Sequence, residues 1–215
     1  MTISNGDFCD SSPAAVTGGE MANAVVPELD EAALAAALAN DLDGAFELFV
    51  IAYRQCIVNF IARMLRDDAR AEDVAQDVFV RAYRALGAYS PERRAALRLR
   101  AWTYAIAHNL TRNAVRDAPA YMDSLDSEGA ERAPASIDPQ PGPEMLALRR
   151  ETWDTIARAI DQLSPRLRPA YVMRYLHDLT YEEIAHALRQ PVGTVKASAH
   201  RAALAVRSHL EHDHV

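Results

Sequence analysis

A proline-rich, acidic stretch divides this sequence into two parts, and that division limits the folds open to the chain. Residues 118–143 contain five prolines and five acidic residues against a single arginine. Proline fixes φ and removes a backbone donor, so no regular helix or central strand runs easily through such a stretch. We therefore expect a flexible acidic linker over 118–143, with one domain before it and one after it.

Apolar residues recur at three- and four-residue spacings on both sides of this linker, which is typical of amphipathic helices. The pattern predicts helices over about 29–40, 42–66, 69–86 and 98–117, and again from 144 onward. The sequence contains no series of short alternating apolar and polar segments that would predict strands. It therefore predicts an all-α protein of two small helical domains, over 28–117 and 144–210.

Both ends of the chain lack this pattern. Residues 1–27 are rich in Ser, Gly, Ala and acidic residues, and we expect a disordered acidic N-terminal extension there. Residues 211–215 are expected to form a frayed tail, and we predict no metal site, no cofactor and no catalytic residue in the chain. Because no run of eighteen apolar residues and no secretory signal is present, we expect a cytoplasmic protein without membrane insertion.

Local signals predict where several helices begin and end. Gly87 is placed to cap the third helix at its C-terminus. Ser164 and Pro165 predict a helix start, with serine as the N-cap and proline at the first helical position. Thr180 and Glu183 form a capping box that opens a short helix in the second domain.

That short helix leads through a break at Arg189–Pro191 into a helix over about 192–207 that contains no acidic residue. Two helices joined by a tight turn, the second basic and lined with small side chains, are typical of a helix-turn-helix that reads DNA. Hydrogen-bond donors gather near the start of the second helix, where they can reach bases and phosphates. The candidate DNA-binding residues there are Thr194, Lys196, Ser198, His200 and Arg201.

The net charge of −7 conceals a strong asymmetry along the chain. Residues 1–53 carry nine acidic residues and no Lys or Arg, whereas residues 81–116 carry eight arginines against Glu92 alone. A basic block of this kind suits a polyanion, because neutralising phosphates releases their condensed counterions. The charge pattern therefore indicates nucleic acid as a partner of the first domain as well.

Several motifs in both domains resemble the extracytoplasmic-function (ECF) sigma factors of the sigma-70 superfamily. Region 2 of that family is similar to AFELFVIAYR, AEDVAQDVFVRAYRAL and LRAWTYAIAHNL. Region 4 is similar to LSPRLRPAYVMRYLHDLTYEEIAHALRQPVGTVKASAHRA. The resemblance covers about 42–117 and 145–210, in the family's order and with a linker where the family has one.

The resemblance implies a promoter-reading subunit that binds core RNA polymerase at its clamp coiled coil and flap and initiates transcription of a stress or signal regulon. It also implies control by an anti-sigma factor. Core contact maps onto Asp73, Gln76, Asp77, Arg81 and Arg84. Minus-10 recognition maps onto Arg98, Arg100, His108, Asn109, Arg112, Asn113 and Arg116, with the 90–99 loop as the pocket for an extruded base. The five candidates of the helix-turn-helix map onto minus-35 reading.

Departures from the family pattern leave two other functions open. Thr103 stands where the family commonly has an apolar residue, His108 stands where arginine is frequent, and the segment before Trp102 is longer and more basic than usual. A stand-alone helix-turn-helix regulator would bind an operator without polymerase, and a sigma-like decoy would bind protein alone. An enzyme is not expected, because no Gly-rich phosphate loop or nucleophile motif is present.

Overall fold

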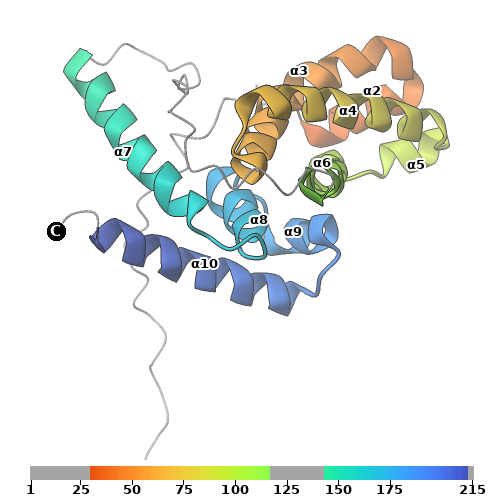
Figure 1. The fold of residues 1–215 in the computed structure, drawn as a ribbon. Coiled ribbons are helices and arrows are strands. Elements are labelled where there is room, and N and C mark those ends of the chain that lie inside the picture. The colour runs from red at the N-terminus through yellow and green to blue at the C-terminus, as the bar shows by residue number, and fades with distance from the viewer. Residues whose placement is uncertain (1–29, 117–142, 213–215) are drawn as a thin grey trace, which may run out of the picture.

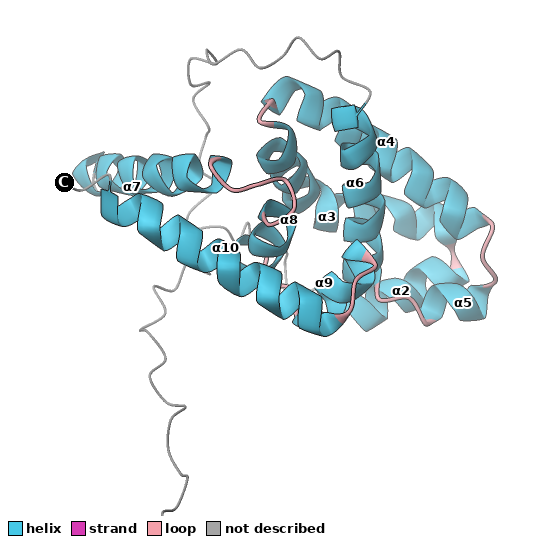
Figure 2. Ribbon diagram, turned by 60° about the horizontal axis from the view of Figure 1, so that its bottom comes forward, coloured by secondary structure: helices cyan, strands magenta, loops and turns pink. Residues whose placement is uncertain are grey.

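The structure is a computed structural model that describes residues 30–116 and 143–212. The predicted N-terminal extension, the final residues and almost all of the predicted linker lie outside the described residues. Every regular element in the described ranges is helical, with short connections between helices (Figure 2). The predicted all-α class is confirmed.

The first half is a bundle around one long central helix. Its helices are α2 (Glu31–Asn40), α3 (Leu42–Leu65), α4 (Asp68–Gly87), the short α5 (Pro91–Ala95) and α6 (Leu99–Arg116). Phe49, Ile57 and Phe60 of α3 are fully buried, because apolar residues at three- and four-residue spacings form one continuous stripe. α3 is long and apolar enough to cross a membrane by length and composition, but α2, α4 and α6 cover it here.

The second half wraps a smaller core with shorter elements. These are α7 (Pro143–Asp161), α8 (Arg168–Tyr171), the π-helical turn η1 (Val172–Leu176), α9 (Tyr181–Leu188) and α10 (Val192–His212). Val195, Ala199 and Ala202 of α10 are buried within this half. α7 and α10 pack side by side at the end farthest from α6 (Figure 2).

Two predicted helix ends are wrong, and one is confirmed. Gly87 is the last residue of α4 rather than a left-handed cap. The C-cap is Ala88, and neither Gly87 nor Ala88 has a positive φ. No helix begins at Ser164: a turn occupies 165–167, and α8 begins at Arg168. The capping box is confirmed, because Thr180 accepts from the Glu183 amide and the Glu183 carboxylate accepts from the Thr180 amide.

The two halves are packed against each other, with α9 packing against α6 (Figure 1). His177, which follows η1, is buried between the rings of Phe60 and Tyr104, at centroid distances of 6.3 and 5.4 Å. The guanidinium of Arg168 donates to the Met64 and Asp161 carbonyls, which joins α8 to the end of α3. A joint core of this kind makes the described ranges a single closed body.

Candidate nucleic-acid interface

The outer face of α4 presents the five predicted polymerase-binding residues to solvent. Ala75, Val78 and Ala82 fill the inner face, and the helical period of 3.6 residues therefore directs the intervening polar positions outward. The exposed positions are Asp73, Gln76, Asp77, Arg81 and Arg84. Val80 and Tyr83 are also exposed beside them. The face thus combines two carboxylates, an amide, two guanidinium groups and some apolar area, and its carboxylates suit a basic protein partner.

The predicted minus-10 residues of α6 divide into an exposed set and a half-buried set. Arg98, Arg112 and Arg116 are exposed. The half-buried residues are Arg100, His108, Asn109 and Asn113. The structure therefore brings all seven onto α6 or its N-cap, but only the three exposed arginines lie open to solvent along their whole length.

Arg100 contacts the second half directly, whereas His108 is affected by burial and by a neighbouring charge. The guanidinium of Arg100 donates to the His177 carbonyl of the second half. Burial, with a smaller contribution from the nearby Arg112 charge, lowers the pKa of His108 to about 4. His108 is therefore neutral near pH 7 and offers a polar edge, whereas an arginine at this position would offer a charge.

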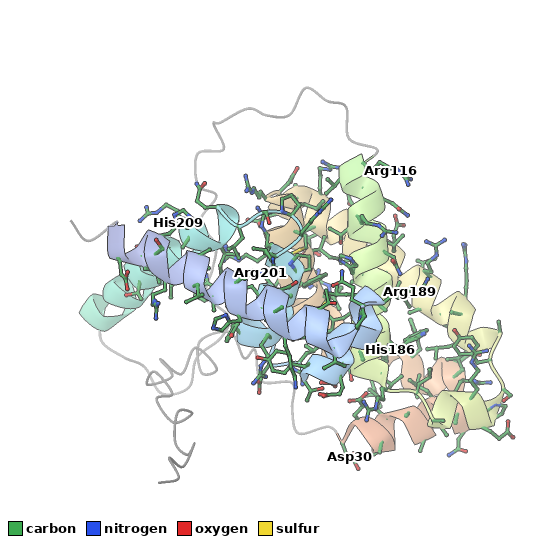
Figure 3. All side chains as sticks on the ribbon, turned by 90° about the horizontal axis from the view of Figure 1, so that it is seen from below. Asp30, Arg116, His186, Arg189, Arg201 and His209 are labelled. Atoms are coloured by element: carbon green, nitrogen blue, oxygen red, sulfur yellow. The ribbon has the colours of Figure 1, made fainter. Side chains whose placement is uncertain are left out.

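A cavity of about 640 Å³ separates the candidate minus-10 face from the helix-turn-helix. On one side it is lined by Trp102, Ile106 and Asn109 of α6, together with Arg81 and Tyr89. Across from them lie His186, Arg189, Gln190 and Pro191, from the end of α9 and the turn after it. Figure 3 shows His186 and Arg189 beside α6. In this arrangement the helix-turn-helix lies across the cavity from the candidate minus-10 face of α6.

The residues of the turn that face α6 were missed by the sequence reasoning. His186 and Arg189 are exposed polar residues at or just before the predicted break at Arg189–Pro191, but they were not among the candidate DNA-binding residues. Their polarity and their position near this break were the available signals. Neither signal identifies α6 as the neighbour, because the contact joins segments about eighty residues apart.

Four of the five predicted minus-35 residues share the outer face of α10. Thr194, Lys196, His200 and Arg201 are exposed, and Figure 3 shows Arg201 on the outside of this helix. Ser198, however, is only 7% exposed and lies on the inner face with the core residues of this half. Ser198 therefore does not join the other four in this structure.

Lys196 is placed by the first turn of α9 as well as by α10. Its ammonium nitrogen lies 5.5 Å from the ring centroid of Tyr181, and the Arg174 guanidinium lies 5.3 Å from the same centroid. A cation near an aromatic face is attracted to the ring electrons while its charge stays accessible to water. Lys196 is thus an accessible hydrogen-bond donor at the exposed start of the predicted reading helix, and the Tyr181 ring helps to orient it.

Comparison with known proteins identifies the family. The family model described as Sigma-70 region 2 matches residues 49–119, and the one described as Sigma-70, region 4 matches residues 153–206. The RNA polymerase sigma-H factor of Pseudomonas aeruginosa is 36% identical over 172 residues, which is 78% of this chain and 86% of that protein. The chain belongs to the sigma-70 family. The ECF RNA polymerase sigma-E factor of Escherichia coli (strain K12) is 32% identical over 167 residues, 75% of this chain and 84% of that protein.

Solved structures agree with this assignment at the level of the fold. CnrH in complex with the cytosolic domain of CnrY has a TM-score of 0.61 and 21% identity, covering 85% of this chain and 98% of that one. RpoE in complex with the anti-sigma factor NepR from Bartonella quintana has a TM-score of 0.58 and 19% identity, covering 77% and 96%.

The protein is therefore an ECF-type sigma factor, a promoter-recognition subunit of bacterial RNA polymerase. A stand-alone helix-turn-helix regulator is not favoured, because the region 2 match occupies the whole first half apart from its N-terminal helices. The relatives are sigma factors rather than enzymes.

Proposed function

We propose that three helical faces of this sigma factor each bind a different partner during promoter recognition. The exposed face of α4, with Asp73, Gln76 and Asp77 at its centre, binds the clamp coiled coil of core polymerase. α6 and the segment before it bind the opened minus-10 element. The outer face of α10 reads the minus-35 element while its domain contacts the flap. The single observation that carries this proposal is that each family-matched helix presents a separate exposed polar face.

The chemistry of each face suits its partner. Carboxylates and an amide on α4 pair with a basic coiled coil, and Arg81 and Arg84 extend this face toward the promoter. Arginine and amide side chains on α6 suit a single strand, which offers both phosphates and unpaired base edges. Lys196 and Arg201 on α10 suit guanine edges or phosphates in the major groove, with Thr194 and His200 as further donors.

Promoter binding also requires the halves to separate. The helix-turn-helix faces α6 across the cavity, and Arg100 is engaged by the His177 carbonyl. We assign the domains as 28–117 and 144–210, with a tether over 118–143 long enough to let the minus-10 and minus-35 faces move apart. The closed body is then a resting form, and the promoter complex is an open form.

An anti-sigma factor is the proposed regulatory partner. The two solved structures described above are complexes with a second protein, and in one of them that protein is described as an anti-sigma factor. A cytoplasmic location follows from the same role, because core polymerase and promoter DNA are found there. Binding of such a partner to the closed body would keep the minus-10 face of α6 partly covered.

The proposed function is tested by core binding and transcription in vitro. Asp77→Arg places a like charge against the basic partner, so we expect about a tenfold or larger loss of affinity for core polymerase. Asp154→Arg, an exposed charge reversal on α7, is the matched control and should bind core normally. Transcription from promoters of the dependent genes should require both the protein and core. Failure of the unaltered protein to bind core would refute the proposal.

A further inference from the structure

The N-terminus of α6 is capped from another helix. Arg98 occupies the N-cap position, but a guanidinium has only donors and cannot accept from the first free amides of the helix. The carboxylate of Glu31 does so instead, since its Oε1 accepts from the Arg100 amide at 3.0 Å. Glu31 is the first residue of α2, whose own start is fixed by the Asp30 side chain accepting from the Ala32 amide. The beginning of α2 thus holds the beginning of α6.

The other end of α2 holds the segment before α6. The carbonyl of Leu38, in the last turn of α2, accepts from Arg94 Nη1 at 2.8 Å. The last carbonyls of a helix lack intrahelical partners, so this contact satisfies one of them. Arg94 Nε also donates to the Tyr89 carbonyl at 3.3 Å, which ties the residues before α5 to the same guanidinium. One half-buried side chain therefore joins α2, α5 and the turn between α4 and α5.

Few contacts other than those with α2 hold segment 88–98 in its shape. α5 is only five residues long, and a helix of that length is not stable on its own in water. Ser90 caps it at 3.4 Å, and Arg93 stacks over the Tyr89 ring at 3.7 Å, but both contacts lie within the segment. Attachment to the rest of the half comes from α2 through Arg94, from packing of Leu97, and from the Tyr89 ring, which lies edge-on to Trp102 of α6 at a centroid distance of 6.3 Å. Glu31 of α2 acts just beyond the segment, at the Arg100 amide.

We infer that α2 is a brace that holds segment 88–98 in the shape that receives the opened minus-10 strand, with Glu31 and Arg94 as positioning residues. This inference rests on the proposed function, in which the 90–99 loop accepts an extruded base. A segment already held in its bound shape does not lose conformational freedom when the strand binds, so affinity is higher. α2 lies before the residues matched by the region 2 family model, so Glu31 falls outside that match, whereas Arg94 falls within it.

The positioning roles are tested with paired substitutions in the full chain bound to core polymerase. Arg94→Ala removes both carbonyl contacts, and Glu31→Ala removes the cap of α6. Each should weaken binding of a single-stranded minus-10 oligonucleotide by about tenfold and reduce the 2-aminopurine signal of an extruded base. Glu31→Gln keeps an acceptor oxygen without the charge and should restore binding to near the unaltered level. Arg158→Ala, an exposed arginine of α7, is the control for loss of charge.

Two further readouts separate positioning from other roles. The slope of log affinity against log salt should stay unchanged in Arg94→Ala, because a direct phosphate contact would lower it by about 0.7. Affinity for core polymerase should also stay unchanged, because general unfolding would reduce it. Unaltered oligonucleotide binding in both alanine variants, a lowered salt slope, or an equal loss in Glu31→Gln and Glu31→Ala would each overturn the inference.

Failure of the proposed function gives a different result. If the unaltered protein on core does not bind the oligonucleotide at all, the function assigned to α6 is wrong. Hydrogen exchange of the amides over 88–100 then tests whether α2 holds the segment in place. Faster exchange there in Arg94→Ala and Glu31→Ala, but not in Arg158→Ala, supports it. Unchanged exchange refutes it.

Discussion

At the scale of single residues, Lys196 carries the clearest expectation. It is the one lysine in a chain whose other basic side chains are arginines, and its ammonium lies over Tyr181 at the exposed start of α10. Lys196→Ala should weaken binding to minus-35 duplex by about tenfold and lower the salt slope by about 0.9, because one cation is lost from the interface. Fluorescence anisotropy over a series of salt concentrations measures both quantities.

Arg207→Ala is the matched control for Lys196. Arg207 lies about three turns beyond Lys196 along α10 and pairs with Glu211 at 3.7 Å, so it is far from the residues assigned to DNA. Its removal should leave minus-35 affinity within about twofold, since exposed ion pairs of this kind contribute little. Equal effects of the two substitutions would show that the reading face of α10 has been misplaced.

The residues of α10 also show what the sequence can predict at this scale. The donors at its start were recognised from their chemistry, and the helical period places Thr194, Lys196 and Arg201 outside. Ser198 was included for its hydroxyl alone, yet it lies three residues after the buried Val195 and next to the buried Ala199. Its inward direction was available from the period, whereas contacts such as Lys196 over Tyr181 depend on the tertiary structure.

At the scale of elements, α9 depends on its capping box. With only eight residues this helix has few internal hydrogen bonds, and the reciprocal contacts of Thr180 and Glu183 satisfy amides at its start. Thr180→Ala should lower the free energy of unfolding by about 1 kcal/mol, the usual cost of losing a side-chain cap. Urea unfolding followed by circular dichroism measures it. Glu182→Ala, an exposed neighbour, should have a much smaller effect.

The elements that the sequence predicted well are those with long periodic patterns. α2, α3, α4 and α6 begin and end within about two residues of the predicted limits, because their apolar stripes and polar caps agree. The start of α8 was missed because Arg168 is buried and donates to the Asp161 and Leu163 carbonyls at 3.0 and 2.9 Å. Those contacts hold the 165–167 turn in place of a helix, and no local signal reports them.

At the scale of the whole molecule, the sequence predicted two domains but not their contact. Linker composition indicates a tether, and a tether is compatible with any arrangement of the parts. The contact depends on residues whose local signals are ordinary: Phe60 and Tyr104 read as core, and His177 as a polar residue at a helix end. The minus-10 candidates were therefore predicted as an open face, whereas Arg100, His108 and Asn109 are partly covered.

The closed body should open on mild acidification because of His177. Burial between the halves, with smaller contributions from the Arg100 and Arg63 charges, lowers the pKa of this side chain to about 3. In the separated form His177 meets water, and its pKa returns toward 6.5. At pH 7 neither form binds the proton, so His177 does not favour opening. As pH falls below 6.5 the separated form gains a proton that the closed form excludes until about pH 3, so the closed form loses stability.

The size of this effect is measurable. At pH 5 the difference in proton binding at His177 favours the separated form by about 2 kcal/mol. This is about a thirtyfold shift of the equilibrium toward that form. Small-angle scattering of the full chain should show a larger radius of gyration at pH 5 than at pH 7, with the helical circular dichroism signal retained.

His177→Phe is the control. It keeps an aromatic ring beside Phe60 and Tyr104 but removes the titration, so its radius of gyration should change less between pH 7 and pH 5. His108, whose pKa burial also lowers, accounts for a remaining pH dependence in that variant. An identical pH profile in both proteins would show that His177 does not control the contact.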